Sequence, residues 1–188
     1  MLTEFYANPL FWIGLYLVGY IIAIAVLSIS GMQTKIENKI PRPLTRIFIL
    51  LTFVAPPLVL PFTRGPKIAI PTPVALTVGI LLLGINFIIK IVAQRQIGVS
   101  PALKSKAKLI TTGIYGVIRH PLYISNGLLA LGMAILFESM YALLFSIPYT
   151  LLYLLIIHFE EKSFLERYGE KYKEYKRKTP WKMIPKVI

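Results

Sequence analysis

Residues 122–137 (LYISNGLLALGMAILF) and 140–158 (MYALLFSIPYTLLYLLIIH) are two apolar runs separated only by Glu138-Ser139. So short a connection predicts a tight antiparallel helical hairpin that crosses a lipid bilayer twice. The first arm is short for a full crossing, and Pro148 is expected to bend the second. The hairpin would bring the residues before 122 close to those after 158.

Three further apolar runs precede the hairpin, and we expect them to form spans at 10–30, 46–62 and 74–93, the second interrupted at Pro56-Pro57. Of the 188 residues, 56% are hydrophobic and 15% are charged, whereas a soluble domain carries about 25% charged residues. The sequence therefore predicts an all-α integral membrane protein with about five transmembrane helices, forming one domain over residues 1–188.

The tail after the last span, residues 159–188, is rich in charge and in tyrosine. Its apolar side chains recur at three- and four-residue spacing, at Phe164, Leu165, Tyr168, Tyr172 and Tyr175. This spacing predicts a cytoplasmic amphipathic helix whose basic face suits an anionic membrane surface. Gly169 is expected to break or bend that helix.

The formal net charge of +13 raises the question of a nucleic-acid partner. In a membrane protein, cytoplasmic loops rich in Lys and Arg are the commoner cause, so we predict no nucleic acid. With five spans, Arg64 and Lys67 fall on one side. The other side receives every basic residue of the tail together with Lys35, Lys39, Arg42, Arg46, Lys90, Arg95, Lys104, Lys106, Lys108 and Arg119. This asymmetry predicts an N-terminus outside and a C-terminus in the cytoplasm.

Cysteine is absent and there are two histidines, His120 and His158. The composition excludes disulfides, thiolate metal sites and a cysteine nucleophile. Two histidines are too few for a histidine-rich metal cage, so no metal site is predicted.

Two polar segments flank the hairpin where apolar sequence meets charge: residues 111–123 (TTGIYGVIRHPLY) and the Glu160-Glu161 pair. His120 and Tyr123 lie on one face of the helix that starts here, and the free N–H groups of a helix start are a favourable place for a carboxylate. The glutamates would bind an ammonium. The arrangement predicts a ligand with an amino-acid moiety. The alternative is an interfacial ion pair of Arg119 with the glutamates, with His120 as a helix cap.

Residues 109–123, LITTGIYGVIRHPLY, resemble the signature of the isoprenylcysteine carboxyl methyltransferase and phospholipid methyltransferase superfamily, approximately L-V-x-x-G-x-Y-x-x-x-R-H-P-x-Y. A second motif of that superfamily is matched in the tail by Glu160, Glu161, Phe164, Tyr168, Gly169, Tyr172 and Tyr175. The resemblance covers roughly the C-terminal half. It implies an S-adenosylmethionine-dependent membrane methyltransferase, and the sequence has no Gly-rich dinucleotide fingerprint.

The resemblance also implies the site residues. It assigns cofactor contacts to Leu109, Ile110, Tyr115, His120, Pro121, Tyr123 and Glu160. In this assignment Glu160 receives the methionyl ammonium, and His120 with nearby helix N–H groups holds the carboxylate. Catalytic candidates are Arg119, His158 and Glu161, the last two as proton acceptors if the methyl acceptor is an amine.

The methyl acceptor stays open: a lipid that enters from the bilayer, either an isoprenylcysteine-like carboxylate or a phospholipid or other lipid. In the isoprenylcysteine branch an arginine typically precedes the matching glutamate by four residues, and Ile156 stands there in this chain. Arg119, Lys90 and His158 are candidates to replace it. Two other functions compete: an NADPH-dependent sterol-reductase-like enzyme, whose motif usually carries Asn-Tyr where this chain has Leu122-Tyr123, and a non-enzymatic small membrane protein.

Overall fold

The computed structural model describes residues 7–29, 32–97 and 108–187. Residue 30 of the first predicted span, and Lys104 and Lys106 of the basic segment before the signature, lie outside these ranges. Within them the chain forms helices and connecting loops and no β-strand, apart from one isolated bridge between Lys67 and Ser139.

Four helical segments of the described residues are long and apolar enough to cross a membrane: α2 (Pro9–Ser28), the composite helix Pro43–Phe62, α6 (Thr72–Ile97) and α8 (Met140–Tyr168). A fifth apolar helix, α7 (Pro121–Leu136), has 16 residues and is therefore about 24 Å long, against about 30 Å for a bilayer core. The protein is thus a helical membrane protein. That α7 makes a fifth crossing stays a prediction.

Local sequence explains where these helices begin and where one is irregular. The Asn8 side chain accepts a hydrogen bond of 2.9 Å from the Leu10 N–H, and Pro9 occupies the first turn of α2. The composite helix consists of α4 (Arg42–Ile49), a π-helical turn (Leu50–Val54), α5 (Ala55–Val59) and a 3-10 turn (Leu60–Phe62). The expected interruption at Pro56-Pro57 is therefore present, because proline supplies no N–H to the turn before it.

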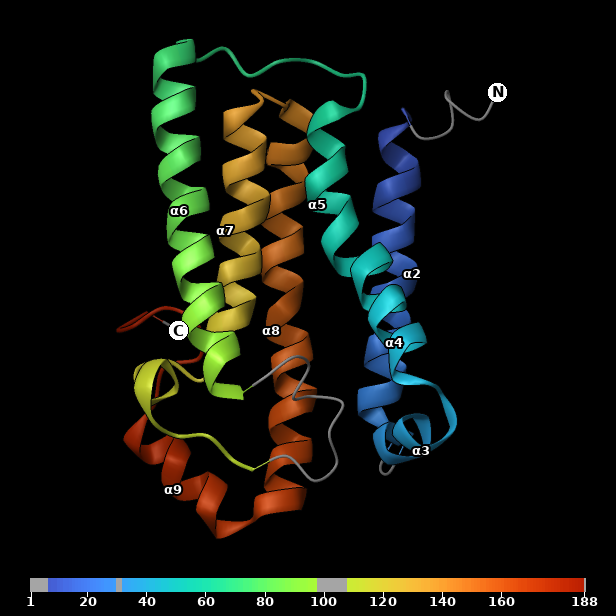
Figure 1. The fold of residues 1–188 in the computed structure, drawn as a ribbon, viewed down its shortest axis with the longest axis vertical. Coiled ribbons are helices and arrows are strands. Elements are labelled where there is room, and N and C mark those ends of the chain that lie inside the picture. Colours follow the sequence, from blue (N-terminus) through green and yellow to red (C-terminus); the bar gives the residue numbers. More distant parts are fainter. Residues whose placement is uncertain (1–6, 30–31, 98–107, 188) are drawn as a thin grey trace.

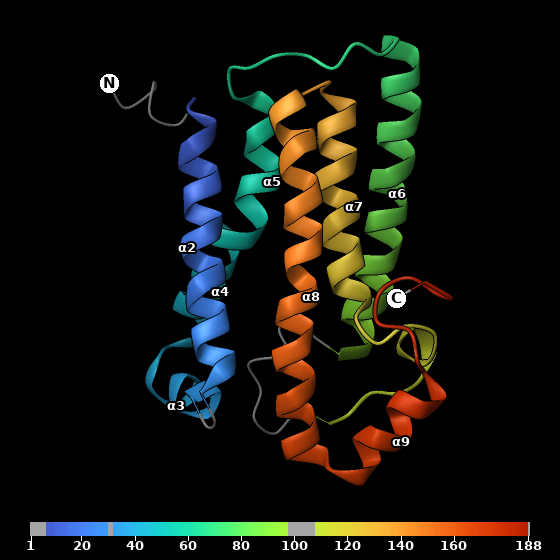
Figure 2. The ribbon, with the colours of Figure 1, turned by 180° about the vertical axis from the view of Figure 1, so that it is seen from behind.

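Helices α6, α7 and α8 lie side by side along their length, with α2 and α5 covering the other side of α8 (Figures 1 and 2). Small residues permit the close approach: a side chain at Gly127 would collide with Thr150 of α8, and one at Gly79 would collide with Leu136 of α7. The turn between α7 and α8 is held by the loop before α6. The Ile68 N–H donates to the Glu138 carbonyl over 2.8 Å.

Two helices extend beyond their predicted ends, and this matters for the site. Helix α6 continues to Ile97 rather than 93, and α8 continues to Tyr168 rather than 158. The predictions ended with the apolar runs, but Lys, Glu, Gln and Arg are good helix formers, so each helix continues past its apolar run. Glu160 and Glu161 consequently lie inside α8 rather than in a separate tail.

The chain reverses after α8 at Gly169, whose φ of 55° is in the left-handed region. Helix α9 (Glu170–Lys178) then runs across one end of the bundle. The segment that precedes α7, drawn in yellow, lies at the same end (Figure 2). Helix α3 (Met32–Lys39) also lies at this end, whereas the loop before α6 and the α7–α8 turn lie at the other (Figure 1).

Candidate functional site

The signature segment, residues 108–120, is a loop that contains a single 3-10 turn, Gly113–Gly116. Gly113 has φ of 61°, and a side chain there would overlap the carboxamide of Gln96 at the end of α6. The backbone conformation favours glycine, and a side chain at this position would also displace the carboxamide of Gln96. The extension of α6 past residue 93 is what brings Gln96 to this loop.

The C-terminal segment, residues 175–182, is hydrogen-bonded to the signature segment. Five bonds join them: Tyr175 hydroxyl to Tyr115 carbonyl (2.7 Å), Thr179 hydroxyl to Gly116 carbonyl (3.2 Å), Arg119 N–H to Trp181 carbonyl (2.9 Å), His120 N–H to Lys182 carbonyl (2.8 Å) and Arg119 guanidinium to Thr179 carbonyl (2.7 Å). The N–H groups of Arg119 and His120 are thus already occupied. These two residues precede the first residue of α7, and their N–H groups are not available to a ligand. That a ligand carboxylate binds at the start of this helix stays a prediction.

The hairpin brings Arg119 and His120 against the end of α8, where Glu161 is the centre of a buried charge cluster. The Arg119 guanidinium donates to Glu161 Oε1 over 2.8 Å and to the Thr179 carbonyl over 2.7 Å. His120 Nε2 lies 3.2 Å from the same carboxylate oxygen. Lys176 Nζ from α9 lies 3.2 Å from the other oxygen. The Glu161 carboxylate therefore has three cationic or donor partners.

Glu160 occupies the opposite side of the imidazole. His120 Nδ1 lies 3.5 Å from Glu160 Oε2, and the Tyr123 hydroxyl donates to the same oxygen over 3.0 Å. The rings of His120 and Tyr123 are stacked with their centroids 5.6 Å apart. His120 is thus held between two carboxylates, one from each of two consecutive residues of α8.

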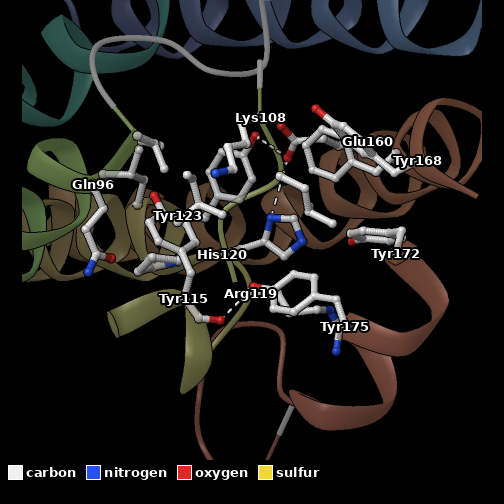
Figure 3. A pocket seen from close by; sticks show the side chains of 16 residues that line it. Gln96, Lys108, Tyr115, Arg119, His120, Tyr123, Glu160, Tyr168, Tyr172 and Tyr175 are labelled. Atoms are coloured by element: carbon white, nitrogen blue, oxygen red, sulfur yellow. Dashed lines mark hydrogen bonds and ion pairs between the residues drawn. The ribbon is translucent and has the colours of Figure 1, made fainter. Parts of the chain in front are cut away.

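A cavity of about 400 Å³ opens between the signature segment, the ends of α6 and α8, and α9 (Figure 3). The side chains of Tyr115, Tyr123, Tyr172 and Tyr175 surround His120 in this view. The remaining lining residues are Gln96, Ile97, Lys108, Leu109, Ile110, Arg119, Pro121, Leu122, Glu160, Phe164 and Tyr168. The cavity is thus mainly aromatic, with one carboxylate and a few polar groups.

Within the part of the chain that the structure describes, three buried polar atoms at this cavity have no hydrogen-bond partner: Tyr115 Oη, Tyr172 Oη and Gln96 Oε1. Tyr115 is 8% exposed and Tyr172 is 1% exposed. A buried polar group without a partner costs roughly 1–3 kcal/mol. A ligand carrying both donors and acceptors would satisfy these atoms, so the cavity is suited to a polar ligand with aromatic or apolar parts.

The structure brings most of the predicted site residues together. Eight line the cavity: Leu109, Ile110, Tyr115, Arg119, His120, Pro121, Tyr123 and Glu160. Glu161 is absent from the lining but contacts Arg119 and His120 from behind. His158 is exposed and does not line the cavity.

Several lining residues were not predicted as site residues. Tyr168, Tyr172 and Tyr175 matched the second family motif, but their spacing was interpreted as a face on the membrane surface. Because the chain reverses at Gly169, Tyr172 and Tyr175 are instead buried beside the signature segment. Gln96 carried no sequence signal beyond its place before the loop.

The environment of His120 predicts a pH-dependent stability. Burial lowers the pKa of His120, but hydrogen bonds and charges from Glu160 and Glu161 outweigh it and raise the pKa above its usual value. Stabilisation from a raised pKa is complete below about pH 6.5, the unfolded value, and is lost as pH rises through the folded-state pKa. We expect the melting temperature in detergent to fall over that interval.

The substitution His120→Asn should remove this pH dependence, whereas His158→Asn, which changes the exposed histidine, should retain it. Thermal unfolding followed by circular dichroism between pH 6 and pH 9 measures both. An unchanged pH profile in His120→Asn would show that another group titrates.

Gly113→Ala is expected to destabilise the fold by about 1–2 kcal/mol from backbone conformation alone, with a further loss from displacement of Gln96. Gly84→Ala is the matched control, because a side chain at Gly84 meets no atom within 4 Å. Denaturant titration in detergent compares them. Equal stabilities of the two variants would mean that position 113 does not need a left-handed residue.

The fold and the site together define a class: a helical membrane protein with a polar, aromatic cavity at one end of its bundle, built around two glutamates, a histidine and an arginine. The chain belongs to the phospholipid methyltransferase family, whose model matches residues 74–171, more than half of its length. That range contains all but the first two residues of α6, and the whole of α7, α8, the signature segment and the reversal at Gly169. Family membership makes the chain a membrane methyltransferase.

Individual relatives cover different shares of the chain. It is 27% identical over 153 residues to the cobalt-zinc-cadmium resistance protein CzcN of Cupriavidus metallidurans, covering 80% of this chain and 68% of that protein. It is 32% identical over 78 residues to the nickel-cobalt-cadmium resistance protein NccN of Alcaligenes xylosoxydans xylosoxydans, covering 41% and 36%. It is 29% identical over 89 residues to the Delta(14)-sterol reductase of Methylotuvimicrobium alcaliphilum, covering 45% of this chain and 20% of the reductase.

Among the described residues, no group of three or more His, Cys, Asp or Glu side chains is arranged to hold a metal ion.

Proposed function

We propose that this protein transfers a methyl group from S-adenosylmethionine to a lipophilic acceptor that reaches the site from the bilayer. The observation that carries the proposal is the cavity beside Glu160 and His120, whose lining includes unpartnered tyrosine hydroxyls and which is built by the segment that matches the family. S-adenosylmethionine supplies an activated methyl group on a sulfonium. The residues of the chain therefore need to bind, orient and exclude water.

The lining residues fit the parts of this cofactor. The Glu160 carboxylate would hold the methionyl ammonium, with Tyr123 fixing one of its oxygens. Leu109, Ile110 and Pro121 provide apolar surface for the adenosine, and the unpartnered hydroxyl of Tyr115 provides a polar contact. The rings of Tyr115, Tyr123 and Tyr172 provide π-faces for the sulfonium.

The methionyl carboxylate needs a cationic partner, and the candidates are Lys108 and the imidazolium of His120. Both ring nitrogens of His120 face glutamate oxygens, so His120 would act through its charge rather than through a hydrogen bond. Its raised pKa favours an imidazolium, held between the two glutamates. Lys108 also lines the cavity. The backbone N–H groups of Arg119 and His120 donate to the carbonyls of Trp181 and Lys182 and would not bind the methionyl carboxylate.

The charge cluster limits the catalytic roles. The oxygens of Glu161 are held by Arg119, His120 and Lys176, so we assign to Glu161 and Arg119 the positioning of His120 rather than proton transfer. His158, which the structure places outside the cavity, receives no role. In transfer, the lone pair of the acceptor forms the new bond to the methyl carbon as the C–S bond breaks and its electrons return to sulfur. Alignment of the two reactants would carry most of the rate enhancement.

The membrane orientation is part of the proposal. The end of the bundle that carries the cavity also carries Lys35 and Lys39 of α3 and the basic α9, whereas Arg64 and Lys67 lie at the other end (Figure 1). By the excess of Lys and Arg in cytoplasmic segments, the cavity would face the cytoplasm, with the N-terminus outside. The whole chain acts as one domain, and the cofactor enters from the cytoplasm.

A sterol-reductase-like activity with NADPH is the second candidate, and the match to the Delta(14)-sterol reductase favours it. The residues after Arg119-His120 weigh against it, because this chain has Pro121-Leu122-Tyr123 where those enzymes usually carry Asn-Tyr. NADPH is also considerably larger than S-adenosylmethionine, and the cavity measures about 400 Å³.

The protein in nanodiscs of total membrane lipid, supplied with methyl-labelled S-adenosylmethionine, tests the proposal. We expect label in the organic extract, dependent on the protein and absent with Glu160→Gln. NADPH oxidation under the same conditions should stay at background. Oxidation of NADPH without methyl transfer would favour the reductase and contradict the proposal.

A further inference from the structure

The segment after α9, residues 179–183, forms a strap across the signature segment. Thr179 at its start and Met183 at its end are each 3% exposed. Met183 belongs to the buried hydrophobic cluster of the bundle, whereas Thr179 and the carbonyls that follow it are hydrogen-bonded to the signature segment. Because the bonded N–H groups belong to Arg119 and His120, the strap holds the backbone that carries His120 to the cavity.

Beyond the strap, Ile184–Val187 form a turn. The Val187 N–H donates to the Ile184 carbonyl over 3.2 Å, and Lys186 has φ of 63°. Proline at the second position and a positive φ at the third are the pattern of a type II turn, whose first and fourth residues lie within about 7 Å of each other. Ile184 and Val187 are therefore neighbours, and they are 42% and 72% exposed. The turn thus presents an apolar pair to its surroundings.

The contact between α6 and α7 locates the boundary of the apolar part of the bundle. Asn86 of α6 donates to the Ser125 hydroxyl of α7 over 2.8 Å. The two helices are antiparallel (Figure 1), so Lys90, four residues further along α6, lies level with Pro121, four residues earlier in α7. Lys90 is the first charged residue of α6, and Pro121 is the first residue of α7. Apolar helices therefore give way to polar loops at this level.

The end of the described chain projects sideways from the bundle at the level where α7 begins, whereas α9 lies further along the bundle axis (Figures 1 and 2). A segment in this position adjoins the lipid headgroups, where apolar side chains accompanied by cations are favourable. Lys182 and Lys186 supply the cations, and the half-buried Trp181 is of a residue type enriched at this depth. The turn and the residues before it thus have the composition of a membrane-interface anchor.

We propose that the turn Ile184–Val187 docks into the headgroup interface of the lipid bilayer, and that the strap transmits this docking to the cofactor cavity. The docked turn keeps the strap paired with the backbone of Arg119 and His120. Release of the turn would loosen that pairing and remove the Thr179 carbonyl from Arg119, so that His120 is held less firmly between its two glutamates. A ligand that needs the paired strap then binds more tightly when the turn is docked. The effect on the ligand rests on the proposed function, whereas the docking does not.

Single fluorescent labels test the docking, because the chain contains no cysteine. Val187→Cys is labelled in nanodiscs of phosphatidylcholine and phosphatidylglycerol. Lys173→Cys is the control, since the Lys173 side chain on α9 is 63% exposed. A nitroxide-bearing lipid quenches labels in the bilayer, and iodide quenches labels in water. We expect the lipid to quench the label at 187 at least threefold more than the label at 173, and iodide to show the opposite order.

The double variant Ile184→Ser/Val187→Ser tests the transmission, because it makes the turn polar without changing the net charge. Calorimetric titration in the same nanodiscs should give a Kd for S-adenosylhomocysteine at least threefold higher than that of wild type. Ile184→Leu/Val187→Leu keeps the apolar pair and should bind as wild type does. The melting temperatures of both variants should stay near that of wild type, since the two side chains are exposed.

Equal quenching of the two labels by the lipid would overturn the docking. A label at 187 that is shielded from both quenchers would overturn it as well, because the turn would then lie against a second protein chain. An unchanged Kd in the serine variant, or a Kd that rises only together with a fall in melting temperature, would overturn the transmission through the strap. A wild-type protein that binds no S-adenosylhomocysteine would contradict the proposed function, and the quenching would still decide the docking.

Discussion

Glu160→Gln is expected to weaken S-adenosylhomocysteine binding at least tenfold, about 1.4 kcal/mol or more. The substitution keeps the shape of the side chain and its contact with the Tyr123 hydroxyl but removes the charge that, in the proposed function, faces the ligand ammonium. Because Glu160 is only 5% exposed, water cannot reach this position to solvate the ligand ammonium in place of the carboxylate. Calorimetric titration of the variant in nanodiscs measures the loss.

Glu166→Gln provides the matched control, because Glu166 is an exposed glutamate six residues further along α8. Its affinity should equal that of wild type. Equal affinities for wild type, Glu160→Gln and Glu166→Gln would remove Glu160 from the ligand site.

Arg119→Met is expected to lower the free energy of unfolding by about 3 kcal/mol, since it leaves the buried Glu161 carboxylate without its closest partner. The same substitution also removes the donor to the Thr179 carbonyl, which helps to hold the C-terminal segment on the signature segment. Reversible denaturant unfolding in detergent measures the change.

The double variant Arg119→Met/Glu161→Leu should recover part of that loss, because it removes the uncompensated charge along with its partner. Arg177→Met, at an exposed position of α9, should leave stability near wild type. If Arg119→Met were as stable as Arg177→Met, the ion pair with Glu161 would not support the fold.

The apolar runs were sufficient to predict the long apolar helices, but not their ends or the polar helix α3. Composition changes at Gln94 and at Phe159, whereas helix geometry does not, because charged residues with long side chains continue a helix readily. The two extensions, to Ile97 and to Tyr168, carry Gln96 and Glu160 to the cavity. They also carry Glu161 to its contacts with Arg119 and His120.

The motif residues of the site could be predicted because the hairpin returns the chain to the same end of the bundle. His158 is two residues before Glu160 in the sequence, but this proximity does not place its side chain at the cavity. A helix advances about 100° per residue, so His158 points about 200° away from Glu160. The roles of Tyr172 and Tyr175 depended on the reversal at Gly169, which a helical spacing pattern does not specify.

The backbone hydrogen bonds of the C-terminal segment were likewise beyond sequence analysis. Residues 179–182 have no regular pattern, yet their carbonyls occupy the N–H groups of Arg119 and His120. This pairing leaves neither of these two N–H groups free for a ligand.

Titration of the wild-type protein in nanodiscs with S-adenosylhomocysteine and, separately, with NADPH tests the central claim most directly. The account predicts saturable binding of S-adenosylhomocysteine with one site per chain and no heat from NADPH above dilution. Saturable binding of NADPH without binding of S-adenosylhomocysteine would contradict it.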